Sequence, residues 1–179
     1  MTSKKPRVDL REKVEDDRGL IKKIELAIPG FRGYRKREDL RIADSLLRNH
    51  IADMIKIVGS TAERCRDSLT KKMKLKDMEG IGGLINKINK IESRVRHAEQ
   101  GYTGVSADFR IDIPEQNRLY EWDLQLLDYV KELQYLSDTL NHAIDGDGEY
   151  SNIMNDLDSK ITSFNNVFDQ RIEMIAGLI

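Results

Sequence analysis

The chain has 179 residues, of which 34% are charged, 39% are hydrophobic and 6% are aromatic, and its formal net charge is −1. This length suffices to bury the core of one domain without disulfide bonds or metal ions. The near-zero net charge excludes a field over the whole protein that would draw it onto nucleic acid or an anionic membrane, so any such contact has to be local.

The first predicted helix spans residues 8–28 and is highly charged. Ile21 and Ile24 belong to a thin apolar stripe at helical spacing, and Pro29 ends the pattern because the residue before a proline leaves the α region. We expect residues 1–10 to be frayed and this helix to be the element least committed to the core.

A second helix is predicted over residues 36–73. Its apolar positions alternate between spacings of four and three: Leu47, Ile51, Met54, Val58, Thr61 and Cys65. An interior glycine costs about 1 kcal/mol relative to alanine, so Gly59 is the point where this helix would kink. The glycine-rich stretch over 79–83 predicts a turn.

Residues 81–98 carry the narrowest heptad pattern, and 101–114 predict an irregular linker. Pro114 suits the first turn of the next helix. The apolar face over 119–143 is broader than the stripe of a two-stranded coiled coil, which predicts a central helix that meets more than one partner.

A turn over 145–148 precedes a last helix that begins near Ser151. The apolar segment 172–179 predicts either docking into the bundle or contact with a partner or a second copy. The pattern as a whole predicts a single domain over 1–179: an all-α antiparallel helical bundle of four to five long helices with coiled-coil-like packing.

The turn before the second helix alternates aromatic with basic side chains. The candidate partner-binding residues are Phe31, Arg32, Tyr34, Arg35, Lys36 and Arg37. Guanidinium groups pair with phosphate and aromatic rings stack on bases, so this turn could contact nucleic acid. It could equally recognise an acidic protein partner, or its aromatic rings could fill the gap between two helices.

The sequence lacks the patterns that enzymes and metal sites require. The segment 145–156 begins like a calcium loop but has Tyr150 where the sixth-position glycine is needed. The glycines over 80–83 match no phosphate-binding fingerprint, and no histidine sits in a metal-binding motif. Cys65 lies on an apolar seam, and a lone cysteine suits a reducing compartment. We therefore expect no catalytic residue, no metal and no cofactor.

Two segments carry a resemblance to a known family. The first has the pattern Pro-Gly-x-x-Gly-Tyr, and the second has Gly-Tyr-x-Gly followed by Tyr-x-x-Asp-Leu; the matching residues are Pro29, Gly30, Gly33, Tyr34, Gly101, Tyr102, Gly104, Tyr120, Asp123 and Leu124. The chain resembles an uncharacterised family of prokaryotic helical proteins. The resemblance implies an association with band-7 (SPFH) membrane-scaffold proteins, adds Tyr102 to the candidate partner-binding residues, and assigns no activity.

These observations predict a non-enzymatic interaction or adaptor protein. Because no signal peptide and no membrane-spanning apolar run is seen, we expect it in the cytoplasm without membrane insertion. The expected partner is another protein, which the resemblance would make part of a membrane-scaffold assembly, or a second copy bound through apolar helix faces. The alternative is a nucleic-acid or ribosome-associated factor that uses residues 31–37.

Overall fold

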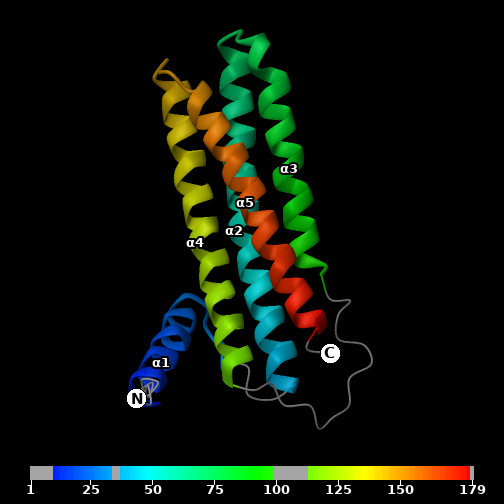
Figure 1. The fold of residues 1–179 in the computed structure, drawn as a ribbon. Helices are drawn as coiled ribbons and strands as arrows, with labels where there is room; N and C mark the ends of the chain where they lie inside the picture. The colour runs from blue at the N-terminus through cyan, green and yellow to red at the C-terminus, as the bar shows by residue number, and fades with distance from the viewer. Residues whose placement is uncertain (1–9, 34–36, 99–112, 178–179) are drawn as a thin grey trace, which may run out of the picture.

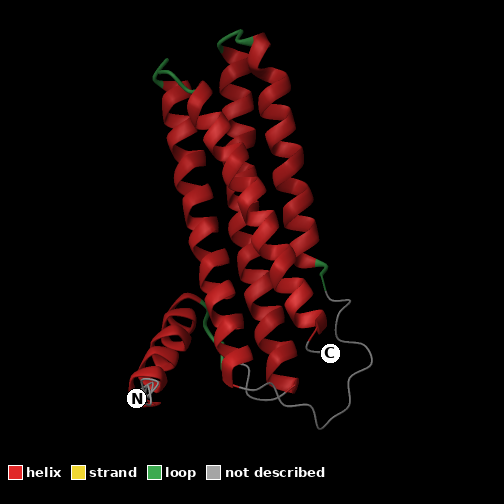
Figure 2. Ribbon diagram, viewed as in Figure 1, coloured by secondary structure: helices red, strands yellow, loops and turns green. Residues whose placement is uncertain are grey.

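A computed structural model describes residues 10–33, 37–98 and 113–177; the remaining residues lie outside the description. The described residues form five α-helices and a short 3-10 turn, with no strand among them (Figures 1 and 2). In chain order these are α1 (Leu10–Ala27), α2 (Arg37–Lys71), η1 (Leu75–Asp77), α3 (Met78–Arg96), α4 (Ile113–Asp145) and α5 (Ser151–Gly177). The predicted all-α helical bundle is confirmed.

The four long helices lie side by side, and α1 leans against the outside of the bundle at α4 (Figure 1). α2 packs against α3 and α4, whereas α5 packs against α4 and, less extensively, α3. Consecutive long helices run in opposite directions. Two helices apart in the chain, α2 and α4 therefore run in the same direction, and they are also packing neighbours, while α3 and α4 lie on opposite sides of the bundle. α3 and α4, although consecutive in the chain, are not among the main packing pairs.

The core is built from the predicted apolar seams. Side chains buried to within a few per cent include Leu47, Ile51, Val58 and Cys65 of α2, Ile81, Ile88 and Val95 of α3, Leu119, Leu126, Leu133 and Leu140 of α4, and Leu157, Ile161 and Phe164 of α5. α4 packs against α1, α2 and α5, which confirms that its broad apolar face meets more than one partner. In the last helix Ile175 is buried, so this part of the apolar C-terminal segment docks into the bundle.

α1 contributes to the core through its C-terminal end. Ile24 and Ile28 are buried, whereas Leu26 on the other side of the helix is exposed. Residues 1–9, for which fraying was expected, lie outside the described residues. Most of the predicted linker lies there too, although Ile113 and Pro114 are already helical and begin α4.

Two glycine-based predictions differ from the structure. The turn predicted over 79–83 is wrong, because these residues form the first turns of α3, and the actual turn comes earlier at 72–74. The burial of Ile81, Leu84 and Ile85 outweighs the weak helix propensity of the glycines. Gly59 does not interrupt α2: it lies buried inside the unbroken helix, where an added Cβ would stand 3.4 Å from Ile88 Cγ2 of α3.

Both turns at the far end of the bundle from α1 are Schellman motifs. After α2, the Lys74 amide donates to the Leu69 carbonyl and the Met73 amide to the Thr70 carbonyl. After α4, the Gly148 and Asp147 amides repeat this pattern on the carbonyls of residues 143 and 144. The left-handed position that usually holds glycine is occupied by Met73 (φ +57°) and Asp147 (φ +56°).

Candidate functional site

The basic-aromatic turn after α1 is only partly a surface. Phe31 is 3% exposed, and its ring meets the ring of Tyr120 in α4 edge to face, with centroids 6.3 Å apart. Phe31 therefore anchors the turn and is not available as a stacking platform for a base. Arg32 is exposed.

The other predicted residues of this turn are not placed. Tyr34, Arg35 and Lys36 lie outside the described residues, as does Tyr102, and Arg37 is described only as the first residue of α2. The structure thus neither brings these candidates together nor separates them.

Two glycines give the turn its path. Gly30 (φ +89°) and Gly33 (φ +83°) both have left-handed backbone conformations. A Cβ added to Gly33 would stand 2.6 Å from the Tyr120 hydroxyl oxygen, so the backbone packs directly on that tyrosine. Gly30 has open space by comparison, since its nearest neighbour is a Leu46 methyl at 3.9 Å. The left-handed backbone accounts for glycine at both positions, and the close packing on Tyr120 is a second reason at position 33.

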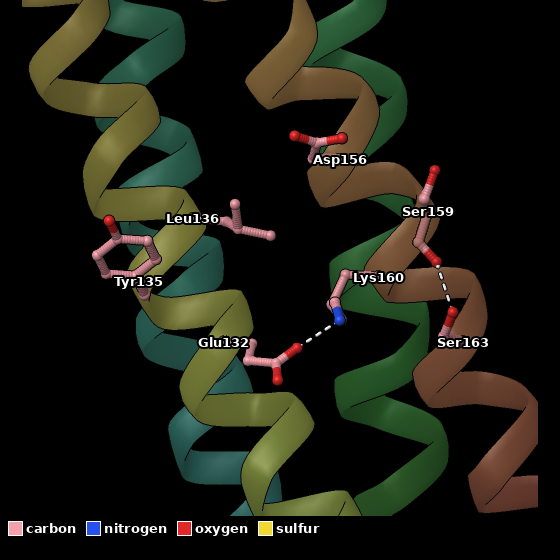
Figure 3. A pocket seen from close by; sticks show the side chains of 7 residues that line it. All are labelled: Glu132, Tyr135, Leu136, Asp156, Ser159, Lys160 and Ser163. Atoms are coloured by element: carbon pink, nitrogen blue, oxygen red, sulfur yellow. Dashed lines mark hydrogen bonds and ion pairs between the residues drawn. The ribbon is translucent and has the colours of Figure 1, made fainter.

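A hollow of about 450 Å³ lies between α4 and α5. Figure 3 shows its lining side chains projecting from the two helices: Glu132, Tyr135, Leu136, Asp156, Ser159, Lys160 and Ser163. Tyr135 is 72% exposed, so most of its side chain faces water beside the half-buried Leu136. The hollow therefore offers apolar surface that no described part of the chain covers.

A second hollow of about 550 Å³ shares Glu132 and Lys160 with the first. Its other lining residues are Leu20 of α1 and, from α4, Glu121, Leu124, Gln125, Asp128 and Tyr129, so α1 also borders this hollow. Lys160 forms an ion pair with Glu132, and its ammonium group stands 5.1 Å from the centre of the Tyr129 ring. This bridge marks the boundary between the two hollows, which we name together the α4/α5 groove.

The α4/α5 groove is acidic. Its lining carries the carboxylates of Glu121, Asp128, Glu132 and Asp156 against the single ammonium of Lys160. Lys131, which does not line the groove, stands 3.3 Å from Asp128. The Ser163 hydroxyl donates to the Ser159 backbone carbonyl, and the lining contains no histidine or cysteine. Exposed aromatic surface bordered by carboxylates is suited to binding a basic, partly apolar segment.

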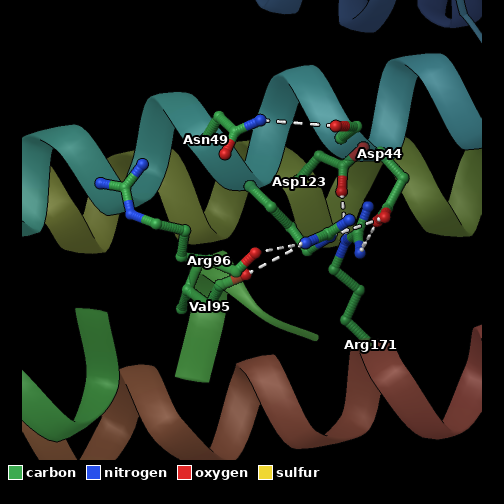
Figure 4. Close-up of polar contacts among 8 residues, drawn as sticks. Asp44, Asn49, Val95, Arg96, Asp123 and Arg171 are labelled. Atoms are coloured by element: carbon green, nitrogen blue, oxygen red, sulfur yellow. Dashed lines mark hydrogen bonds and ion pairs between the residues drawn. The ribbon is translucent and has the colours of Figure 1, made fainter. Parts of the chain in front are cut away.

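Four charged side chains are buried inside the bundle, near the end where α2 and α4 begin (Figure 4). Arg171 donates from Nε to Asp123 and from Nη1 to Asp44, both at 2.6 Å. Arg48 donates from Nε to the other oxygen of Asp44 at 2.7 Å. We call Asp44, Arg48, Asp123 and Arg171 the buried charge network; its formal charges sum to zero.

The buried charge network also caps the C-terminal end of α3. Nη1 of Arg48 donates to the carbonyl oxygens of Val95 and Arg96, which are among the last carbonyls of α3. Burial alone would raise the pKa of Asp44, but the guanidinium groups of Arg171 and Arg48 outweigh it and hold that pKa below its usual range. The network is therefore a charge-balanced structural tie among α2, α3, α4 and α5.

Sequence reasoning missed this network. Asp44 and Arg48 are four residues apart on one helix, which is a usable signal for a local pair. The positions of Asp123 and Arg171 also interrupt the apolar faces of their helices. Nothing in the sequence, however, says that these two interruptions meet the same pair.

At the opposite end of the bundle, the turn after α2 is bound to the turn after α4. The Lys72 ammonium donates to the carbonyls of Ile144 and Asp145 at 2.7 Å and pairs with Asp147 at 2.9 Å. This places a cation on the C-terminal carbonyls of α4. The Tyr150 hydroxyl donates to Asp77 at 2.6 Å, and this bond, with burial, raises the pKa of Tyr150 to about 12.

Two further features singled out in the sequence are Cys65 and the calcium-like turn over 145–148. Cys65 is buried, and burial raises the pKa of its thiol to about 12, so the nucleophilic thiolate is suppressed. Asp147 of the calcium-like turn is engaged by Lys72 and Lys74. In the described part of the chain, no three histidine, cysteine or carboxylate side chains are grouped so that they could hold a metal ion.

In comparisons with protein-family models, curated proteins and solved structures, the chain matches none. Among the described helices, none combines the length and the hydropathy that crossing a membrane requires.

Proposed function

We propose that the protein is a non-enzymatic interaction module that binds a segment of another polypeptide in the α4/α5 groove. The observation that carries this proposal is the exposed ring of Tyr135 beside Leu136 in an acidic hollow between two rigid helices. Apolar surface of this kind costs free energy while it faces water and is a common mark of a docking site.

The shape of the groove favours an elongated ligand. Two hollows follow one another along α4 and share the Lys160–Glu132 bridge, so a bound segment would run parallel to the helices. An amphipathic helix or an extended peptide has this form. Basic residues on the segment would pair with Glu121 and Asp156, for which no ion pair is found within the described ranges.

The basic-aromatic turn offers fewer residues for recognition than the sequence suggested. With Phe31 in the core, recognition of nucleic acid by residues 31–37 would rest on Arg32 and the undescribed positions. Association with a membrane-scaffold assembly stays a prediction of the resemblance. All the side chains that line the α4/α5 groove are described, so the experiment below tests the groove.

Site-specific photocrosslinking in the native cell tests the proposal. A photoreactive amino acid at Ser159, which lines the groove, should yield a discrete protein adduct after irradiation. The matched control places it at Asn86, an exposed position on α3, which does not line the groove. Tyr135→Ala should remove the adduct at Ser159 without unfolding the protein. The absence of an adduct at Ser159, or the same adducts from both positions, would contradict the proposal.

A further inference from the structure

The turn between α2 and α3 exposes apolar side chains at one end of the bundle. Met73 is 76% exposed and Leu75 is 64% exposed. They alternate with lysines, the six residues being Lys71, Lys72, Met73, Lys74, Leu75 and Lys76. We name this segment the lysine-flanked tip.

Met73 is unfavourable twice in the isolated molecule. Its backbone is left-handed (φ +57°), a conformation that glycine adopts freely and that other residues rarely adopt. Its side chain faces water, so packing of the side chain does not stabilise this conformation. The hydrogen bonds of the Schellman motif hold this backbone conformation, so the exposed apolar side chain is the feature of Met73 that the turn itself does not require.

The lysine-flanked tip is held rigidly. The ammonium groups of Lys72 and Lys74 both approach Asp147, and the bond from Tyr150 to Asp77 fixes the residue that follows. A segment that is already ordered loses little entropy when it binds. Met73 and Leu75 are therefore presented as a preorganised apolar knob among cations.

The lysine-flanked tip and the α4/α5 groove are complementary in chemistry. The tip offers two flexible apolar side chains and the exposed cations of Lys71 and Lys76, and the groove offers Tyr135 and Leu136 beside acidic side chains. The exposure of Met73 and Leu75 shows that the tip does not occupy the groove of its own molecule. Contact between the two surfaces requires a second molecule.

We propose that the lysine-flanked tip of one molecule docks in the α4/α5 groove of a second copy. This inference rests on the proposed function and names the segment that the groove binds. Because the two surfaces differ, the contact is heterologous, so repetition builds an open chain or a closed ring.

Sedimentation velocity of the purified full chain tests this directly. The mean mass should rise with concentration up to about 500 µM, since small interfaces bind weakly. Added salt should suppress the rise, because it screens exposed charges. Met73→Gly should weaken association about tenfold or more, as truncation of a central apolar anchor does. The control Ile57→Ala removes an exposed apolar side chain from the middle of α2 and should leave association unchanged.

A mixing experiment distinguishes this contact from a symmetric one. Met73→Gly leaves the groove intact, and Tyr135→Ala leaves the tip intact, so each variant alone should be monomeric. An equimolar mixture should form a dimer that contains one of each and grows no further. Two variants that stay monomeric when mixed, while the unmodified protein associates, would overturn the heterologous contact.

Three other outcomes also decide whether the lysine-flanked tip binds a second copy. If the unmodified protein stays monomeric over the whole concentration range, the inference fails. Vesicles of phosphatidylcholine and phosphatidylserine that bind this monomer but not Met73→Gly would assign the tip to membranes instead. A Ser159 crosslink to a different protein, with a monomeric purified chain, would overturn the inference and leave the proposed function standing.

Discussion

Arg171 in α5 donates a 2.6 Å hydrogen bond to Asp44 in α2, a residue 127 positions earlier in the chain. α2 and α5 are not among the main packing pairs of the bundle, so this ion pair reaches through the interior. Both groups are buried, and the same guanidinium also binds Asp123 in α4. The pairing forms only when these helices are in register, so the network discriminates against shifted packings.

Removal of one guanidinium should be costly. Arg171→Met withdraws the cation from two buried carboxylates, and breaking a buried ion pair from one side costs about 3–5 kcal/mol. We expect this loss in the free energy of unfolding measured with a chemical denaturant. The control is Arg66→Met, which breaks an exposed pair with Glu63 and should cost less than about 1 kcal/mol. Equal losses for the two variants would refute the structural role of the network.

The stability of the protein should fall in acid through Asp44. Because its pKa in the folded state lies below the unfolded value of 3.8, the folded state gains stability above that pH and loses it as pH falls further. Denaturant titrations below pH 5 should therefore show a steeper pH dependence for the unmodified protein than for Asp44→Asn. Asp67→Asn, at an exposed position of α2, is the control and should keep the original slope. An unchanged slope in Asp44→Asn would argue against this assignment.

Gly33 should tolerate substitution less well than Gly30. Alanine at either position has to adopt a left-handed backbone, but only at position 33 does the new Cβ collide with Tyr120. We expect Gly33→Ala to lose about 1–3 kcal/mol more than Gly30→Ala, as overpacking does. Tyr120→Phe removes the colliding hydroxyl, so the double variant should be more stable than additivity allows. Strict additivity would show that the close approach is not the cause.

Tyr150 should titrate late in alkali. Its pKa of about 12 in the folded state lies above the ordinary tyrosine value of 10.0, so its contribution to stability is complete below pH 10 and is lost as pH rises through 12. Absorbance of tyrosinate should show a component that titrates near pH 12, and Tyr150→Phe should remove it. Asp77→Asn should move that component to lower pH, because the acceptor loses its charge. A late component that survives in Tyr150→Phe belongs to another residue.

Helical periodicity predicted much of the fold because it is local. The seam through Leu47, Ile51 and Val58 is buried as expected, and Pro114 lies in the first turn of α4. The prediction failed at the glycines of α3, where propensity favoured a turn. Packing of Ile81 and Leu84 decided otherwise, since burial of two large side chains exceeds the intrinsic cost of the glycines.

The sequence predicted the candidate site less well than it predicted the fold. Of the interpretations left open for the basic-aromatic turn, filling of a gap between helices holds for Phe31, whose ring packs on Tyr120, almost ninety positions away. The pattern of residue types did not show which partner the ring would meet. Tyr135 lies on a face of α4 with the polar residues Lys131, Glu132 and Asp138, so the sequence carried a signal for its exposure, whereas the hollow beside it depends on how α5 packs against α4.

The sequence by itself determined the helices, their apolar seams and their alternating directions, because each depends on neighbouring residues and short turns. Tertiary structure alone decided that α2 and α4 lie side by side in parallel, that Arg171 joins Asp44 to Asp123, and that a hollow opens between α4 and α5. These features depend on how the helices are ordered around the core. That order is set by which seams fit together in space, and spacing along one helix carries no information about it.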